Sequence, residues 1–218
     1  MAYFVQSLAM SLSREKLLRL TQYWARLCAW FLSRSNSLPG TIATWKLLMK
    51  QAALIRKLSR LGNNVEYFRA AFQTFAAKDQ DSVIRYTSMG RQLGFAGYLT
   101  CDAATSLDIL GIRKLKAAKR VQMEASRFWS AALLCSVIAQ VYNLSSLRQQ
   151  AQSDKEDNAS QRKHIATEQM IYQLQLCSDL CDLTISTSSF NLVPVSDGII
   201  GVCGVLSTLI GIYSPRRS

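Results

Sequence analysis

The amino-acid sequence predicts an all-α fold: a membrane-associated helical bundle with amphipathic N-terminal helices and a Gly-rich hydrophobic C-terminal helix. Apolar residues recur at three- and four-residue spacing along almost all of the 218 residues, the pattern of helices with one apolar face. Only three prolines are present, Pro39, Pro194 and Pro215, and each stands where other signals also indicate a break. Charged residues make up 18% of the chain, below the roughly 25% that is usual in soluble domains.

Three helices are expected in the first part of the chain. The first covers Arg14–Arg34 and ends in Ser33–Gly40, where Ser, Asn, Pro and Gly favour a turn. The second covers Thr44–Leu61 and stops at Gly62-Asn63-Asn64, a typical helix C-terminal signal. The third covers Val65–Lys78, with apolar positions that suit a helix packed in a core. These positions are Phe68, Ala71, Phe72 and Phe75.

The middle of the chain contains its longest uncharged stretch. A weaker helical pattern from Asp79 to Leu110 leads into the basic segment Ile112–Arg120. Phe128–Leu147 then runs for twenty residues without a charge, which is about the length that spans a bilayer. Because this stretch includes Gln140 and Asn143, a buried helix is an equally good interpretation.

The last part of the chain begins with a polar segment, Gln149–Lys163, that is predicted to be a linker or exposed loop. A helix over His164–Ile185 follows, and the apolar stretch Gly198–Tyr213 comes near the end. We therefore expect four regions: a basic helical membrane-binding region (1–120), a hydrophobic helix that is buried or membrane-embedded (121–148), a polar linker (149–163), and a C-terminal helix with a Gly-rich membrane segment (164–218).

Positive charge is concentrated in the first half of the sequence. The formal net charge is +12, and residues 1–120 carry 19 basic and 6 acidic side chains, against 7 and 8 in residues 121–218. Such a basic surface suits an anionic partner, either nucleic acid or acidic lipid. No known nucleic-acid motif accompanies it, and leucines rather than base-reading side chains stand between the basic residues. The sequence therefore predicts an acidic phospholipid membrane as partner and no nucleic acid.

The second helix carries its basic and apolar residues on opposite faces. At about 100° per residue, the basic side chains fall within one arc of roughly 120°, and no acidic residue interrupts the helix. The basic face consists of Lys46, Lys50, Arg56, Lys57 and Arg60. The opposite face consists of Leu47, Leu54, Ile55, Leu58 and Leu61.

Two interpretations of this helix are open. The helix could lie in the membrane interface, with cations on lipid phosphates and leucines at the acyl boundary. Each cation near an anionic surface would contribute about 1 kcal/mol. The alternative is a bundle helix with an ordinary solvated basic face. The first helix repeats the arrangement, and its Tyr23, Trp24 and Trp30 suit either an interfacial anchor or a helix–helix core.

The C-terminal stretch combines apolar residues with stripes of small ones. Its sixteen uncharged residues are fewer than the ~20 that span a bilayer. Small residues at three- and four-residue spacing let membrane helices approach closely, whereas glycines cost about 1 kcal/mol each in a soluble helix. We therefore predict a membrane-embedded packing helix. Its packing residues are Gly198, Gly201, Cys203, Gly204, Ser207 and Gly211.

Neither catalysis nor cofactor binding is indicated by the sequence. It has no Gly-rich phosphate loop and no nucleophile elbow, and its single histidine, His164, lies beside the polar segment. Cys177 and Cys181 are one helical turn apart, but too few further ligands are near them for a metal site. With no secretory signal, the six cysteines are expected to be reduced. We predict a protein that is not an enzyme and binds no metal or cofactor.

Four blocks of sequence resemble the peroxisomal biogenesis factor 11 family of peroxisomal membrane elongation and division proteins. They are SREKLLRLTQYWARL (Ser13–Leu27), LIRKLSRLGNNVEYFRAA (Leu54–Ala71), the pair Cys101-Asp102 in YLTCDAATSL, and the Gly-rich block within Cys181–Tyr213. The blocks occur in the family's order and span nearly the whole chain. Some animal members carry a long Gly-rich insert where this chain has only a short polar segment, so we expect a compact fungal-type member.

The resemblance implies a protein of the peroxisomal membrane that inserts cationic amphipathic helices into one leaflet, bends and elongates the membrane, and promotes peroxisome division. It also implies self-association and recruitment of the dynamin-related fission GTPase or its adaptor. The main alternative is an oligomeric membrane channel passing small metabolites, for which Gln140 and Asn143 are the candidate lining residues. A soluble helical scaffold is a third interpretation, and it requires the Gly-rich stretch to be buried in protein.

Overall fold

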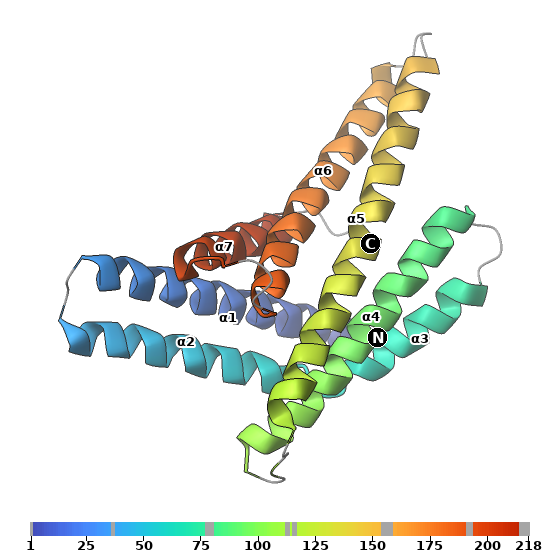
Figure 1. Cartoon of the computed structure of the whole chain (residues 1–218). Coiled ribbons are helices and arrows are strands. Elements are labelled where there is room, and N and C mark those ends of the chain that lie inside the picture. The colour runs from blue at the N-terminus through green and yellow to red at the C-terminus, as the bar shows by residue number, and fades with distance from the viewer. Residues whose placement is uncertain are drawn as a thin grey trace.

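The computed structural model describes residues 2–35, 38–76, 81–111, 114, 117–153, 159–190 and 194–213. These ranges contain seven α-helices and no strand (Figure 1). In chain order the helices are α1 (Ala2–Arg34), α2 (Pro39–Ser59), α3 (Asn63–Ala76), α4 (Ser82–Ile109), α5 (Ala118–Ser153), α6 (Ala159–Ser188) and α7 (Asp197–Tyr213). The predicted all-α fold is therefore confirmed.

The helices are longer than the sequence pattern predicts. Residues 149–163 are predicted to be a linker, but α5 continues to Ser153 and α6 begins at Ala159, while residues 154–158 lie outside the described ranges. The Gln, Ala and Lys residues of this segment are good helix formers. Polar composition therefore marks the ends of two helices here. Of the basic segment Ile112–Arg120, residues 118–120 form the start of α5.

Local signals set the helix ends near the turns. Pro39 occupies the first turn of α2, where its missing N–H costs nothing. Gly62 has a φ of +91° between α2 and α3, a conformation that favours glycine over other residues. Asp81 caps α4, because its Oδ1 accepts a hydrogen bond from the Val83 N–H at 3.0 Å. These turns fold the chain into antiparallel pairs.

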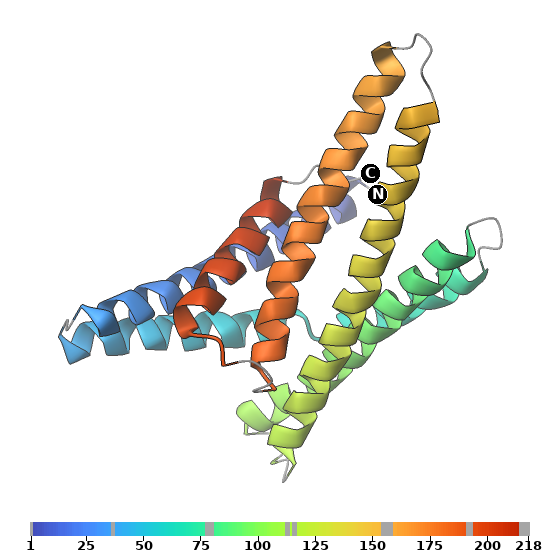
Figure 2. The same ribbon diagram turned by 45° about the horizontal axis from the view of Figure 1, so that its top comes forward.

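Six helices contact one another in a closed ring, in which α2 meets α4 only near the C-terminal end of α2 (Figure 1). Going around it, α1 contacts α7, α7 contacts α6, α6 contacts α5, α5 contacts α4, α4 contacts α2, and α2 contacts α1. Helix α3 packs against α4. Figures 1 and 2 show the α5–α6 pair extending well beyond the other helices at one end. The ring places side chains from distant parts of the sequence in one interior.

Among the described residues, the buried side chains are mostly small or polar, whereas many large apolar side chains are exposed. The largest fully buried side chains are four serines: Ser106, Ser136, Ser186 and Ser207. Buried Tyr23, Ile185 and Ile200 form a small apolar cluster. By contrast, large apolar side chains on all seven helices are exposed. A water-soluble protein has the opposite distribution, whereas a helical membrane protein uses small residues for packing and points polar ones inward.

Helix α5 is the one described helix that is long and apolar enough to cross a membrane by length and composition. The core helix of a soluble protein can pass the same test. Helix α7 is apolar but shorter. Its outward face consists of Ile199, Val202, Leu206, Leu209 and Ile212. Because this face is apolar along the whole helix, it is suited to lipid.

Candidate functional site

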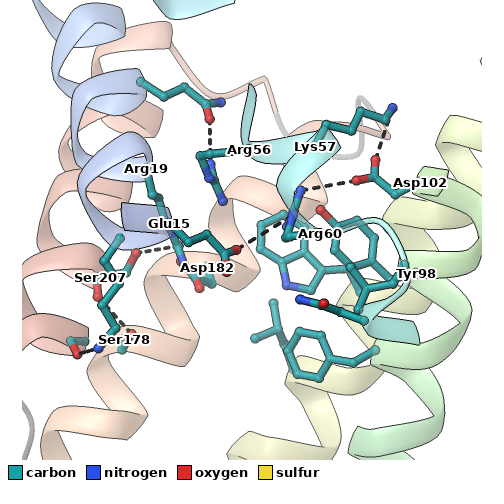
Figure 3. A pocket seen from close by; sticks show the side chains of 18 of the residues that line it. Glu15, Arg19, Arg56, Lys57, Arg60, Tyr98, Asp102, Ser178, Asp182 and Ser207 are labelled. Atoms are coloured by element: carbon teal, nitrogen blue, oxygen red, sulfur yellow. Dashed lines mark hydrogen bonds and ion pairs between the residues drawn. The ribbon is translucent and has the colours of Figure 1, made fainter. Parts of the chain in front are cut away.

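A cavity of about 590 Å³ lies inside the ring, and all seven helices contribute to its lining (Figure 3). Its lining is rich in charge. The basic residues are Lys16, Arg19, Arg56, Lys57, Arg60 and Arg91, and the acidic residues are Glu15, Asp102, Asp179 and Asp182. Because charged side chains are rarely inside a protein without a purpose, this cavity is the candidate functional site.

Asp102 on α4 joins α4 to the C-terminal end of α2. Its Oδ1 lies 3.1 Å from the Lys57 Nζ, and its Oδ2 lies 3.2 Å from the Arg60 Nη2. The side chains of Asp102, Lys57 and Arg60 are 7%, 10% and 17% exposed. The Lys57 Nζ also donates hydrogen bonds to Thr105 and Gln122, at 2.6 and 3.1 Å. One carboxylate therefore holds two largely buried cations.

Arg60 extends this group of charges towards α1. Its Nε lies 3.8 Å from the Glu15 Oε1, and its guanidinium lies over the Tyr98 ring at 5.4 Å from the centroid. An aromatic face attracts a guanidinium, and the attraction strengthens when both groups are removed from water. Arg60 thus connects the end of α2 with both α1 and α4.

Arg19 makes the corresponding connection on the other side of the cavity. Its Nη2 forms an ion pair with Asp182 on α6 and donates a hydrogen bond to the Ser207 Oγ on α7, at 2.8 Å. A single arginine therefore ties α1 to both C-terminal helices. Its planar fork of N–H donors suits this use, since one group can serve partners in different directions.

Arg56 is buried without an acidic partner. It is only 9% exposed, and its one hydrogen bond in the described structure goes from Nη1 to the Gln22 Oε1 at 2.5 Å. No ion pair within the described ranges includes it. Burial lowers the pKa of Arg56, and the nearby Arg60 guanidinium lowers it further. An arginine nevertheless keeps its proton in proteins, so the cavity contains a buried positive charge.

The five predicted lipid-binding cations of α2 do not share one exposed face. Lys46 and Lys50 are exposed, whereas Arg56, Lys57 and Arg60 turn into the cavity. The helical spacing correctly places these basic residues on one side of α2. In the folded protein, however, the part of this side near the end of the helix faces the cavity, where acidic residues of other helices lie. Lipid contact by Lys46 and Lys50 stays a prediction, while the other three are committed to the interior.

The opposite, apolar face of α2 points outward in part. Leu47, Ile55 and Leu61 are exposed, while Leu54 and Leu58 are half-buried.

The core pattern predicted for the third helix is wrong for its aromatic residues. Ala71 of α3 is buried, but the side chains that follow the same spacing lie outside; these are Val65, Phe68, Phe72 and Phe75. The large apolar residues of α3 thus form an external stripe.

The small residues of the C-terminal helix lie against α1. A Cβ added to Gly198 would come within 2.6 Å of the Trp30 ring, and one added to Gly201 within 3.1 Å of the Leu27 Cα. Gly204 is closer still to Tyr23. Ser207 completes the buried stripe, and Cys203 is half-buried, whereas no described residue comes within 4 Å of a Cβ position at Gly211. Close packing of α7 therefore uses the first part of the predicted set.

The two candidate channel-lining residues on α5 do not form an exposed stripe. Gln140 is buried, with no partner for its Oε1, and Asn143 is half-buried. The exposed side chains on this part of α5 are apolar, including Leu134, Ile138 and Val141. This geometry gives the channel interpretation no additional support.

Sequence reasoning does not identify the acidic residues of the cavity as partners of the basic ones. Asp102 lies 42 positions from Arg60, and Asp182 lies 163 positions from Arg19. Spacing within one helix cannot reveal such distant pairs. The available signal is that Asp102, Asp179 and Asp182 interrupt apolar helical stretches, where an acidic residue needs a partner.

Comparison with known proteins gives matches over the full length of the chain. The sequence profile of Peroxisomal biogenesis factor 11 (PEX11) matches residues 1–215. Peroxisomal membrane protein PMP30A of Candida boidinii is 26% identical, covering 93% of this chain and 88% of that protein. Peroxisomal biogenesis factor 11 of Schizosaccharomyces pombe is 22% identical, covering 92% and 88%. Peroxisomal membrane protein PMP27 of Saccharomyces cerevisiae is 25% identical, covering 95% and 91%.

No solved structure matches the chain. The sequence matches carry the assignment, because one family profile and relatives from several organisms agree over almost the same residues. The family is one of biogenesis factors and is not an enzyme family. The protein therefore belongs to the Peroxisomal biogenesis factor 11 family and is located in the peroxisomal membrane.

Proposed function

We propose that the protein inserts the outward apolar faces of α2 and α3 into an acidic leaflet of the peroxisomal membrane. The observation that carries the proposal is the exposure of these faces together with the exposure of Lys46 and Lys50 on α2. A helix that places apolar side chains at the acyl boundary and cations at the headgroups is stable in the interface. Area added to one leaflet bends the membrane, so the activity is elongation of the peroxisome before division.

The internal ion pairs support this proposal by fixing the inserting helices to the rest of the molecule. Asp102 holds the end of α2 on α4, and α4 also packs against α3. A wedge must be rigid to bend a bilayer. The proposal further includes self-association of the protein. It also includes recruitment of a dynamin-related fission GTPase, directly or through an adaptor, since elongation must be followed by scission.

Reversing the charge of Lys46 and Lys50 together is expected to weaken binding to anionic vesicles by about thirty-fold or more, because two cations at an anionic surface contribute about 2 kcal/mol. Flotation of the full-length protein with vesicles of phosphatidylcholine and phosphatidylserine measures this. The control is charge reversal at the exposed Arg162 and Lys163 near the start of α6. Equal losses in both double variants would contradict a specific role for α2.

Replacing Phe72 and Phe75 with Gln is expected to abolish vesicle tubulation while leaving the fold intact. Each inserted phenylalanine contributes about 1.5–3 kcal/mol of transfer free energy, so partition should fall about a hundredfold or more. Both side chains are exposed, so unfolding should change by less than about 0.5 kcal/mol. Electron microscopy of vesicles mixed with the full-length protein reports tubules.

The matched control replaces the same two phenylalanines with leucine, which keeps an apolar side chain at each position. This variant should still form tubules. If the glutamine variant also forms them as efficiently as the natural sequence, α3 is not the inserting surface and the proposed wedge is wrong.

A further inference from the structure

We infer that the central cavity binds a phosphate-bearing anion and that Arg56 is its principal ligand. This inference does not depend on the membrane-bending function proposed above. It concerns the interior of the ring, whereas the wedge uses the outer faces of α2 and α3. The shared chemistry is a phosphate group, whether it belongs to a lipid headgroup or to a small soluble phosphate ester.

The charges of the cavity do not cancel. Six basic residues line it, against four acidic ones. Asp102 is shared by two cations, and Asp182 is paired with Arg19. Asp179 accepts hydrogen bonds from the neutral side chains of Ser136 and Gln175, at 2.6 and 2.8 Å. Glu15 is paired with Arg60. Each of the four carboxylates therefore already has a partner, and the cavity has an excess of positive charge.

Arg56 is a buried basic residue that this arrangement leaves without an acidic partner among the described residues. Arg91 forms no ion pair there either, but its charge acts on Asp179 and opposes the rise in the pKa of that carboxyl caused by burial. Arg56 is 9% exposed, and within the described ranges its Nε has no hydrogen-bond partner and its Nη1 donates to the neutral amide of Gln22. Burying an unpaired charge is costly, so folding alone does not explain an arginine here. Figure 3 shows Arg19, Arg56 and Arg60 gathered around the same space.

Several buried arginine donors around the cavity have no hydrogen-bond partner among the described residues. The Nε atoms of Arg19, Arg56, Arg60 and Arg91 are buried and lack a hydrogen-bond partner, and all four residues line the cavity. The Arg60 Nε still faces the Glu15 carboxylate at 3.8 Å. Buried donors are normally paired, so the three other donors, on Arg19, Arg56 and Arg91, indicate a ligand rich in acceptor oxygens. A phosphate has several such oxygens and matches the planar fork of arginine.

The size of the cavity suits a ligand larger than a lone inorganic ion. Its volume of about 590 Å³ lies within the roughly 300–1,000 Å³ of small-molecule sites. The aromatic rings of Tyr98 and Trp129 also line it, so the organic part of a phosphate ester has apolar surface to contact. A lipid headgroup and a soluble phosphate ester both meet these requirements.

The test measures phosphate binding by the full-length protein in a mild nonionic detergent. The probes are dioctanoyl phosphatidic acid, inorganic phosphate and glycerol phosphate, and dioctanoylglycerol is the probe without phosphate. Titration calorimetry gives the affinity. We expect saturable binding of at least one phosphate probe and none of dioctanoylglycerol. Phosphatidic acid alone would identify a lipid headgroup, and glycerol phosphate would identify a soluble ester; both outcomes support the inference.

Arg56→Gln is expected to weaken this binding by about tenfold or more, because a hydrogen-bonded charge is lost. Arg148→Gln is the matched control: it is the same substitution at an exposed position of α5, and it should leave the affinity unchanged. If Arg56→Gln does not fold, Arg56→Lys is the second variant. It keeps the positive charge but lacks the planar set of guanidinium N–H donors, so it should still bind the phosphate probe more weakly than the natural sequence does.

Two results would overturn the inference. One is the absence of saturable binding for every phosphate probe. The other is an affinity in a folded Arg56 variant equal to that of the natural protein. A vesicle tubulation assay with the same preparations distinguishes failure of the cavity inference from failure of the proposed wedge. The Phe72 and Phe75 substitutions change the outer surface, whereas the Arg56 substitution changes the cavity.

Discussion

Asp102→Asn is expected to destabilise the protein by about 3–5 kcal/mol, because it leaves the buried Lys57 and Arg60 without their shared counter-ion. Both carboxylate oxygens are engaged, at 3.1 and 3.2 Å from the two cations. Asparagine has the same shape as aspartate, so the loss reports charge and not a packing defect. Denaturant unfolding of the full-length protein in detergent, followed by circular dichroism, measures the change.

The control for this substitution is Glu124→Gln, which removes an acidic group from an exposed ion pair. Glu124 and Arg127 on α5 are 49% and 64% exposed, and such pairs contribute about 0–1 kcal/mol. The interior pair should therefore matter several-fold more than the surface pair. A loss of similar size in both variants would show that Asp102 is not effectively buried in the folded protein.

Gly204→Leu is expected to separate α7 from α1 and to cost about 3 kcal/mol or more, at the upper end of overpacking effects. A Cβ at this position would overlap the ring of Tyr23, which is itself buried. The helices must then move apart, and the hydrogen bond from Arg19 to Ser207 is lost with them. Unfolding in detergent gives the free-energy change, and alkylation of the half-buried Cys203 thiol reports local opening.

Gly211→Ala is a control substitution at another glycine of the same helix. In the part of the chain that the structure describes, nothing lies within 4 Å of a Cβ at Gly211, and alanine is favoured over glycine in a helix by about 1 kcal/mol. This variant should be as stable as the natural protein or slightly more so. If Gly204→Leu is also harmless, α7 does not pack on α1 through its glycines.

Helix periodicity identifies most of the fold, because local spacing determines where a helix runs and which residues share a face. It locates α7 to within one residue and α2 to within five, and it groups the glycines that contact Tyr23, Leu27 and Trp30. Family resemblance adds the location in the peroxisomal membrane. Local spacing predicts too long a linker over residues 149–163, because polar residues can also extend helices.

The direction in which each face points is not encoded in local spacing. A helix with basic and apolar sides has two arrangements, and the choice depends on partners elsewhere in the chain. For α2 the partners are Asp102 and Glu15, on other helices. For α3, the exposed Phe72 and Phe75 follow a core-like spacing that an outer surface facing lipid explains equally well. The cavity and its buried Arg56 depend on which face of each helix points inward, and local spacing therefore does not predict them.

The contact between α2 and α4 has a consequence for how the molecule responds to its ionic surroundings. It includes ion pairs from Asp102 to Lys57 and Arg60, whose side chains are largely buried. Dissolved salt screens buried charge pairs much less than exposed ones. A change in ionic strength should therefore loosen the attachment of the exposed cations Lys46 and Lys50 to an anionic membrane while leaving the joint between α2 and α4 intact.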